Sequence, residues 1–219
     1  MGYVVWMPVQ TKGSWLGEGD DHTFMNMLGN GLRAYEKGSY GGWGGREAGK
    51  KEAANFSFDS ASNDTSASSM ANKLGTLNSQ PDKSTKESAY PDFFPKAQRD
   101  FAARLKWSVT PAYKNANHEP VAKIEGPLNI MASAGQKIRI NGEVSDPDGN
   151  SVSVKWWQFH VGSYPNKVEI SNPDKAQTEV LIPNDAIGGQ TIHLILEATD
   201  NGTPSLTRYQ RMIITIKGK

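Results

Sequence analysis

The feature that most constrains the fold of this chain is a change of hydrophobic period after Asn117-His118-Glu119-Pro120. Beyond these residues apolar and polar side chains alternate with a period of two, and turn-forming residues interrupt the alternation at short intervals. The predicted strands are Val121–Ile124, Gln136–Val144, Val152–Phe159, Lys167–Ile170, Thr178–Ile182, Thr191–Thr199 and Thr207–Ile216. Asp146-Pro147-Asp148-Gly149 and Asp200-Asn201-Gly202 supply turns between them.

About seven short strands in roughly a hundred residues is the count of an immunoglobulin- or cadherin-like β-sandwich. The alternation places Val152, Val154 and Trp156 on one side of their strand, and a single buried tryptophan there is usual for such a core. We therefore expect a mainly β fold, with the sandwich at residues 117–219.

The opposite, outer face of the same strands is unusually apolar. It carries Trp157, Phe159, His193, Ile195, Tyr209 and Arg211, provided that their strands are neighbours. So large an apolar patch requires an explanation. The preceding residues could pack against it, which we favour because an apolar face beside another domain is most simply an interface. Alternatively, its aromatic rings form a platform that stacks on sugar rings.

Residues 1–116 are irregular and contain two predicted helices. Asp20 and Asp21 can cap a first helix, in which Phe24, Met27 and Leu28 follow at helical spacing. Gly29 and Gly31 would end this helix, and Leu32 would extend its apolar side.

A second helix is predicted at Pro91–Trp107, with Phe94, Ala97, Phe101 and Leu105 on its apolar side. Between the helices the chain from about 47 to 90 is polar, with few large apolar residues, and we expect a long surface loop.

Composition excludes several function classes. Lysine and arginine number 24 against 23 acidic residues, a net charge of +1, so no charge excess predicts a nucleic-acid partner. No apolar run approaches the ~20 residues of a membrane-spanning helix, and the chain contains no cysteine for disulfides or thiolate sites. The first ten residues lack the pattern of a signal peptide, and a strand-like Tyr3–Trp6 indicates a chain cut from a longer protein.

No complete active site is evident. Asp146, Asp148 and Asp200 could be calcium ligands, but turn formation accounts for them equally well and we favour it. The four histidines, His22, His118, His160 and His193, have no metal-ligand spacing. Glu18, Asp20 and Asp21 lie close in sequence, but one loop does not guarantee the carboxyl separation that glycoside hydrolysis needs.

Several short motifs, in order along nearly the whole chain, carry a family resemblance. They are Glu18-Gly19-Asp20, Asn30-Gly31-Leu32-Arg33, Gly41-Gly42-Trp43-Gly44-Gly45-Arg46, Arg99–Leu105, Asn117-His118-Glu119-Pro120, Trp156-Trp157-Gln158-Phe159 and Thr199–Pro204. With these motifs the chain resembles secreted bacterial proteins often labelled cellulose-binding, which join a nucleoside-hydrolase-like domain to a C-terminal immunoglobulin-like domain.

The resemblance implies that this chain is the C-terminal part of such a protein. Residues 1–116 would be the end of the hydrolase-like domain, and the missing N-terminal part of that domain would be a partner. The parent would be secreted, periplasmic or on the cell surface. Nucleoside hydrolases bind calcium, so the parent could bind calcium with Asp20 as its late ligand, although capping of a helix is the simpler role for Asp20 in this chain.

Three functional hypotheses follow. The first is a non-catalytic carbohydrate-binding module, for polysaccharide or oligosaccharide, in which Trp157, Phe159 and Tyr209 stack on a glycan and Trp43 is a second platform. The second is a brace and partial active-site contributor of a calcium-dependent, nucleoside-hydrolase-like glycosidase. The third is a structural spacer, with Trp157 and Phe159 buried against the helix Pro91–Trp107.

Overall fold

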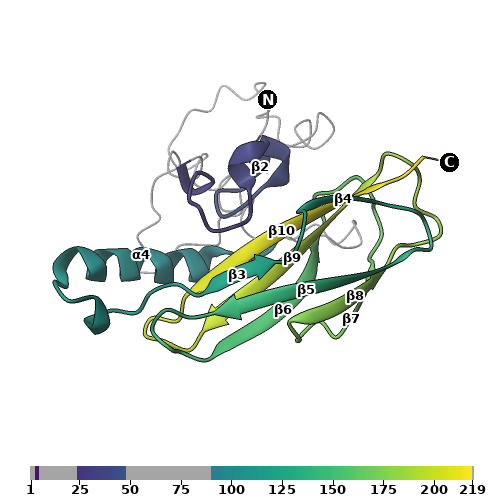
Figure 1. Cartoon of the computed structure of the whole chain (residues 1–219). Helices are drawn as coiled ribbons and strands as arrows, with labels where there is room; N and C mark the ends of the chain where they lie inside the picture. The colour runs from purple at the N-terminus through teal and green to yellow at the C-terminus, as the bar shows by residue number, and fades with distance from the viewer. Residues whose placement is uncertain (1–2, 5–23, 48–89, 219) are drawn as a thin grey trace, which may run out of the picture.

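The computed structural model describes residues 3–4, 24–47 and 90–218 of the chain. Two four-stranded sheets lie face to face over the C-terminal half (Figure 1). The first sheet has the order β4-β10-β9-β6, formed by β4 (Asn129–Ala132), β10 (Thr207–Ile216), β9 (Thr191–Asp200) and β6 (Val152–Phe159). The second has the order β3-β5-β8-β7, formed by β3 (Val121–Ile124), β5 (Lys137–Ser145), β8 (Gln177–Leu181) and β7 (Glu169–Ser171). The predicted mainly β fold with a C-terminal sandwich is confirmed.

The strand β4 is the one strand of the sandwich that the sequence did not predict. Its four residues pair in parallel with the end of β10, in a register that joins Asn129 to Ile213 and Ala132 to Ile216. The remaining strands pair antiparallel. A four-residue strand is too short for alternation to distinguish it from a loop, and β4 forms because β10 offers it an edge.

The core of the sandwich lies between the two sheets, as alternation predicts. Trp156 of β6 is buried there, and its indole Nε1 donates a hydrogen bond to the Lys175 carbonyl at 2.9 Å. The inward-facing side chains of β9 and β10 surround it, and among them are Leu194, Leu196 and Ile214. Burial of these aliphatic chains, worth roughly 1.5–3 kcal/mol for each, is the main stabilising term of the sandwich.

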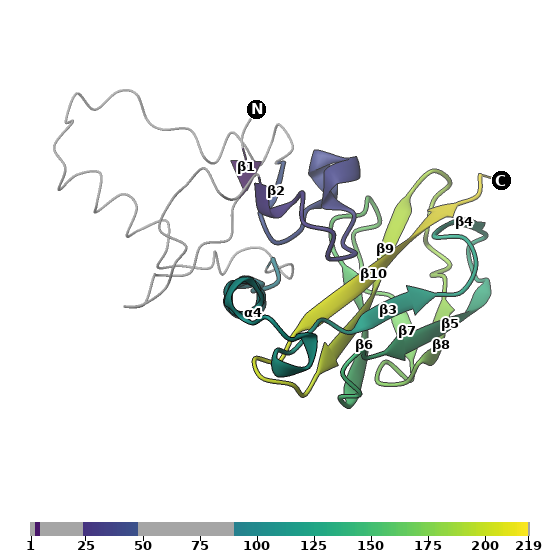
Figure 2. The ribbon, with the colours of Figure 1, turned by 60° about the vertical axis from the view of Figure 1, so that its left-hand side comes forward.

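The outer face of the first sheet is covered by the N-terminal half of the chain. Figure 2 shows α4 (Phe94–Val109) end-on beside β10, with the segment 24–47 next to it. A second hydrophobic cluster lies between these elements and the sheet. The N-terminal segment also contains two short 3₁₀ turns, η1 (Ala34–Glu36) and η2 (Gly38–Tyr40), and a two-residue pairing of β1 (Tyr3–Val4) with β2 (Arg46–Glu47).

The first predicted helix is much shorter than expected within the described residues. Helical backbone is present at 24–25 and gives way to a turn, so the prediction that the helix continues through Met27 and Leu28 to the glycines is wrong. Phe24 and Met27 are exposed, whereas Leu32 is buried. The carbonyls of Asn30 and Gly31 instead accept hydrogen bonds from the Tyr209 and Arg211 N–H groups of β10. The predicted caps Asp20 and Asp21 lie outside the described residues.

The second predicted helix is confirmed as α4, with a different buried side. It begins at Phe94, after Asp92, whose carboxylate accepts the Phe94 N–H at 3.0 Å. Its buried residues are Ala97, Asp100 and Ala103, whereas Leu105 is exposed, which corrects the predicted apolar side. The reason is electrostatic, because Asp100 turns inward to meet a buried arginine of β10.

A third short turn, η3 (Tyr113–Asn115), joins α4 to the sandwich.

Candidate functional site

Aromatic rings fill the space between the first sheet and the N-terminal half. We call this group the ring layer: Trp43, Tyr90, Phe93, Trp157, Phe159 and Tyr209. Phe93 of the segment before α4 lies at its centre, with ring centroids 6.0 Å from Phe159 and 6.0 Å from Tyr209 in edge-to-face orientations. Edge-to-face contacts are the favourable arrangement for aromatic pairs. The layer therefore binds the two halves through specific ring geometry.

The ring layer contains all four residues that the sequence proposed as a glycan platform. Trp43 is 1% exposed, Phe159 2% and Tyr209 2%. No face of these three rings is open to a ligand, which corrects the prediction that they form a surface platform. Trp157 differs, because it is only half-buried at the edge of the layer. The favoured interpretation of the outer face as an interface agrees with this packing.

Two polar side chains on the same face are also buried. The Arg211 guanidinium donates to the Tyr40 carbonyl at 2.8 Å and to the Gly41 carbonyl at 2.8 Å, and lies over the Phe159 ring. Burial lowers the pKa of Arg211 to about 9, so it remains charged at neutral pH. His193 lies 3.4 Å from an Arg211 nitrogen, and because a guanidinium can only donate, we assign the His193 Nδ1 as acceptor. Burial, and then the Arg211 charge, lower the pKa of His193 to about 3, so its ring is neutral.

Ion pairs hold α4 against the sheet. The buried Asp100 carboxylate accepts a hydrogen bond from Arg104 Nε at 2.7 Å through Oδ2. Its other oxygen, Oδ1, lies 2.9 Å from Arg208 Nη2 of β10 and forms an ion pair without hydrogen-bond geometry. Arg208 Nη2 also lies 3.0 Å from a Glu119 oxygen. Removal of one partner from a buried pair leaves an uncompensated charge, so these contacts fix the orientation of the helix.

Beside Trp157 the outer face of β6 and β9 is hollowed. The hollow has a volume of about 420 Å³ and is lined by Ser153, Val154, Lys155, Pro173, Asp174, Glu197 and Thr199. Cross-strand pairing explains the polar floor, because Ser153 lies opposite Thr199, and Lys155 opposite Glu197. Trp157 is next along β6, and its Nε1 donates to Glu197 Oε2 at 3.1 Å. The hollow thus combines an acid, a base and hydroxyl groups, and the half-buried Trp157 adjoins it through its hydrogen bond to Glu197.

The alternation in the sequence placed Trp157 on this face, but it did not indicate the hollow. Pro173 and Asp174 come from the loop between β7 and β8, and the closeness of that loop to the edge strand β6 depends on tertiary packing. The carboxylate of Glu197 is oriented by Lys96 of α4, whose Nζ lies 2.6 Å away. The covering helix therefore helps to shape this site.

A second hollow, of about 270 Å³, lies between the N-terminal segment and α4. It is predominantly apolar and is lined by Phe24, Met25, Leu28, Trp43, Ala97, Asp100, Phe101 and Arg104. Trp43 forms part of its wall but is only 1% exposed, too little for a sugar ring to stack on it. The proposed second platform on Trp43 therefore has no open ring.

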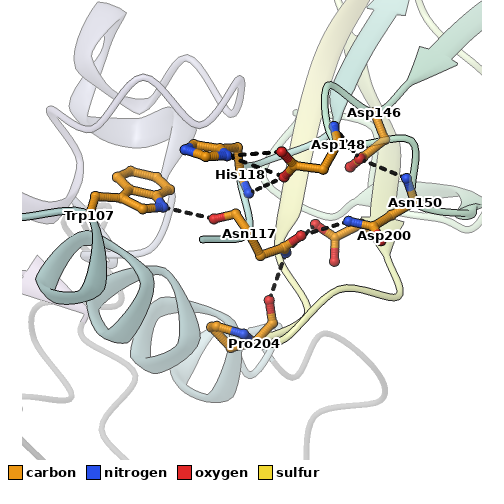
Figure 3. A network of polar contacts seen from close by, with 8 residues as sticks. All are labelled: Trp107, Asn117, His118, Asp146, Asp148, Asn150, Asp200 and Pro204. Carbon is orange, nitrogen blue, oxygen red and sulfur yellow. Dashed lines mark hydrogen bonds and ion pairs between the residues drawn. The ribbon is translucent and has the colours of Figure 1, made fainter. Parts of the chain in front are cut away.

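A junction network joins α4 to the turns of the sandwich: Trp107, Asn117, His118, Asp146, Asp148, Asn150, Asp200 and Pro204 (Figure 3). Asn117 is its centre, and its side chain donates to Asp200 at 3.0 Å and to the Pro204 carbonyl at 2.9 Å. The Asn117 side-chain oxygen Oδ1 accepts a hydrogen bond from Asn150 at 2.7 Å. The Asn117 backbone carbonyl accepts one from the Trp107 indole at 2.7 Å.

Two of the three aspartates that invited a calcium interpretation, Asp146 and Asp200, act here as turn formers, whereas the Asp148 carboxylate accepts the His118 N–H. Asp146 Oδ1 accepts the N–H groups of Asp148 and Asn150, and Asp200 Oδ1 accepts those of Gly202 and Leu206. Within residues 3–4, 24–47 and 90–218, no group of three or more potential ligands could hold a metal ion. The predicted ligand Asp20 lies outside those residues.

Comparisons with known proteins agree with this architecture. Residues 137–216 match the family model of the C-terminal domain of the cellulose-binding protein Sde0182. A solved structure of a nucleoside hydrolase-related hypothetical protein from Saccharophagus degradans, described as associated with carbohydrate metabolism, superposes with a TM-score of 0.69 at 30% identity. The similarity covers 91% of this chain and 48% of that protein, so this chain spans about half its length. The resemblance stated from the sequence motifs is confirmed.

Other solved structures match this chain much more weakly. Three N-terminal domains of the outer capsid protein Hoc of bacteriophage RB49 match at a TM-score of 0.31 and 10% identity, over 45% of this chain and 30% of that one. Domains 4 and 5 of the S-layer protein SbsC match at a TM-score of 0.31 and 16% identity, over 46% of this chain and 48% of that one. These likenesses are too weak to support an argument. A search of the curated proteins found no match, and within the described residues no helix is long and apolar enough to cross a membrane.

Proposed function

We propose that this chain is a carbohydrate-associated, non-catalytic module, because its residues 137–216 match the C-terminal domain of a cellulose-binding protein. That match is the observation that carries the proposal. The relative associated with carbohydrate metabolism supports it, because the similarity extends over 91% of the chain. The parent protein would act outside the cytoplasm, where it would encounter polysaccharides.

The hollow beside Trp157 is the surface that best suits a glycan. A half-buried indole can stack on the C–H face of a sugar ring, while Lys155, Glu197 and the hydroxyls of Ser153 and Thr199 offer partners for sugar hydroxyl groups. The Glu197 side chain is held by Lys96 and Trp157, so its ordering costs little on binding. A sugar polymer could cross this open hollow along the edge strand β6.

Retention on insoluble polysaccharides tests this function. The intact chain should be depleted from solution by at least one of cellulose, xylan and chitin, while an unrelated protein of similar size is not. Trp157→Ala should weaken retention several-fold, because it removes the stacking ring. A chain that none of the three polymers retains would contradict the proposal.

A second function is favoured by the closed ring layer. The sandwich would brace the hydrolase-like domain of a longer, calcium-dependent glycosidase, since Trp43, Phe93 and Ala97 from the N-terminal half seal its outer face. In this function Asp20, carried by the segment before Phe24, would contribute to the calcium site of the parent.

The longer parent protein tests the bracing function. It should hydrolyse an N-ribosyl or related glycosidic bond in a calcium-dependent manner, and Asp20→Ala should abolish that activity. A parent that keeps its full activity with Asp20→Ala would remove Asp20 from the mechanism, and a parent without any such activity would leave the non-catalytic module as the function.

A further inference from the structure

Four flat side chains form a column at the junction between α4 and the sandwich. The Arg104 guanidinium lies 5.4 Å from the centre of the Trp107 ring. The Trp107 and His118 rings are stacked, with centroids 5.4 Å apart and planes 10° from parallel. The His118 and Tyr113 rings are stacked at 3.5 Å with parallel planes. The column therefore links the end of α4, the turn η3 and the first residues of the sandwich.

Hydrogen bonds fix the column at several points. Arg104 is held by the buried Asp100, and the Trp107 indole by the Asn117 carbonyl at 2.7 Å. His118 is held twice by Asp148, whose Oδ2 accepts its backbone N–H at 2.6 Å and whose Oδ1 lies 3.1 Å from its Nδ1. These side chains have little freedom left to lose, so a ligand that binds the column bears a small entropic cost.

Tyr113 keeps 60% of its surface exposed, although one face of its ring is covered by His118. The uncovered face must then be open to solvent. Two carboxylates adjoin the column, Asp148, which lies 3.1 Å from His118 Nδ1, and Glu119, the residue after His118. The pKa of Tyr113 is raised, first by desolvation and then by the charges of Asp148, Glu119 and Asp146. Acidic side chains around an open aromatic face are acceptors for the hydroxyl groups of a neutral sugar.

We propose that Tyr113, presented by the column, is a binding site for a pyranose ring, distinct from the hollow beside Trp157. This inference rests on the proposed carbohydrate function and adds a second contact surface to it. A sugar stacks its C–H face on the phenol ring, and Asp148 and Glu119 accept its hydroxyl protons in hydrogen bonds. His118 is a positioning residue, because it supports the ring without facing the ligand.

A matched pair of tyrosines allows a direct test. Tyr35 is 63% exposed in η1 and has no comparable column, so Tyr35→Ala controls for the loss of any exposed tyrosine. With cellohexaose, xylohexaose and chitohexaose as soluble probes, Tyr113→Ala should weaken binding of the best probe roughly three- to tenfold. Tyr113→Phe should bind within about twofold of the unaltered chain, because it keeps the ring.

The outcomes separate this inference from the proposed function. If Trp157→Ala weakens binding while Tyr113→Ala and Tyr35→Ala leave it unchanged, the Tyr113 site is overturned and the carbohydrate function stands. If Tyr113→Phe binds as poorly as Tyr113→Ala, stacking is not the interaction and the proposal fails. If no probe and no polymer binds the unaltered chain, both the site and the carbohydrate function fail.

Discussion

His193 and Arg211 form a buried polar pair in an otherwise apolar interface. Among the described residues neither forms an ion pair with a carboxylate, and Arg211 instead contacts the Tyr40 and Gly41 carbonyls and the ring faces of Tyr40 and Phe159. These contacts come from the N-terminal half, whereas both side chains belong to the sandwich. The neutral state of His193 is therefore a property of the docked interface.

The buried His193 makes the stability of this chain depend on pH. Its pKa in the folded chain is about 3, below the unfolded value of 6.5, so protons bind preferentially to the unfolded state as the pH falls. Its contribution is fully present above pH 6.5 and is lost toward pH 3. Between about pH 6.5 and 5 the free energy of unfolding should fall by up to roughly 1.4 kcal/mol per pH unit.

Urea denaturation at a series of pH values measures this slope. His193→Asn should flatten the slope, whatever it does to the absolute stability, because the titrating group is gone. His160→Asn is the control, since its ring is only half-buried, and it should leave the slope in place. An unchanged slope in His193→Asn would contradict the account of the interface.

The sequence correctly predicted which residues lie on the outer face of the sheet, but it did not predict whether their rings are exposed or buried. Alternation placed Trp157, Phe159 and Tyr209 together correctly, because a period of two decides the side of a sheet. It could not decide whether the face was open. Burial of those rings depends on Phe93, at the start of α4, and on Trp43, in a glycine-rich loop, and both are distant in sequence from the sheet.

At the scale of elements, the N-terminal segment completes an edge of the first sheet. β4 pairs with β10 from Ile213 to Ile216. Further along the same edge of β10, the Asn30 and Gly31 carbonyls accept hydrogen bonds from the N–H groups of Tyr209 and Arg211. An uncovered edge strand would expose unpaired N–H groups. This arrangement requires Gly31, which has a positive φ of 91° and approaches the Tyr209 carbonyl so closely that a Cβ would lie 1.7 Å from its oxygen.

Gly31→Ala should therefore displace the segment from β10. We expect a loss of at least about 2 kcal/mol in the free energy of unfolding, from backbone strain and overpacking together. Gly126→Ala is a matched control, because Gly126 has a φ of +84° but no atom within 4 Å of its Cβ position. The control should lose only about 1 kcal/mol, from strain alone. Equal losses in the two variants, measured by urea denaturation, would contradict this docking.

The helix α4 shows what amphipathic pattern can and cannot predict. The helical spacing located the element to within a few residues, but its buried side includes the charged Asp100. A pattern based on hydrophobicity assigns an aspartate to the solvent side. Its burial is compensated by Arg104 one turn later and by the buried Arg208 of β10, a partner that lies more than a hundred residues later in the chain.

At the scale of the whole molecule, the described residues form a sandwich and an N-terminal part, residues 24–47 and 90–116, that packs on its outer face. This chain spans about half the length of the S. degradans relative, and the assignment of the N-terminal part to a larger hydrolase-like domain stays a prediction. Motif order along the chain was sufficient to predict the family resemblance, and alternation predicted the sandwich. The hollow beside Trp157 could not be predicted, because it combines β6, β9 and the loop between β7 and β8. The Tyr113 column lies within 104–118, but its ring stacking depends on the irregular turn η3 and on the contact of His118 with Asp148.

The measurement that tests the central claim most directly is a binding isotherm on the polysaccharide that retains the chain best, for Trp157→Ala and Trp43→Phe side by side. Both variants lose an indole, but Trp157 lies half-exposed beside the hollow and Trp43 is buried in the ring layer. The account predicts that Trp157→Ala weakens binding several-fold while Trp43→Phe changes stability and leaves the isotherm unchanged. Weaker binding by Trp43→Phe with an unaltered isotherm for Trp157→Ala would contradict it.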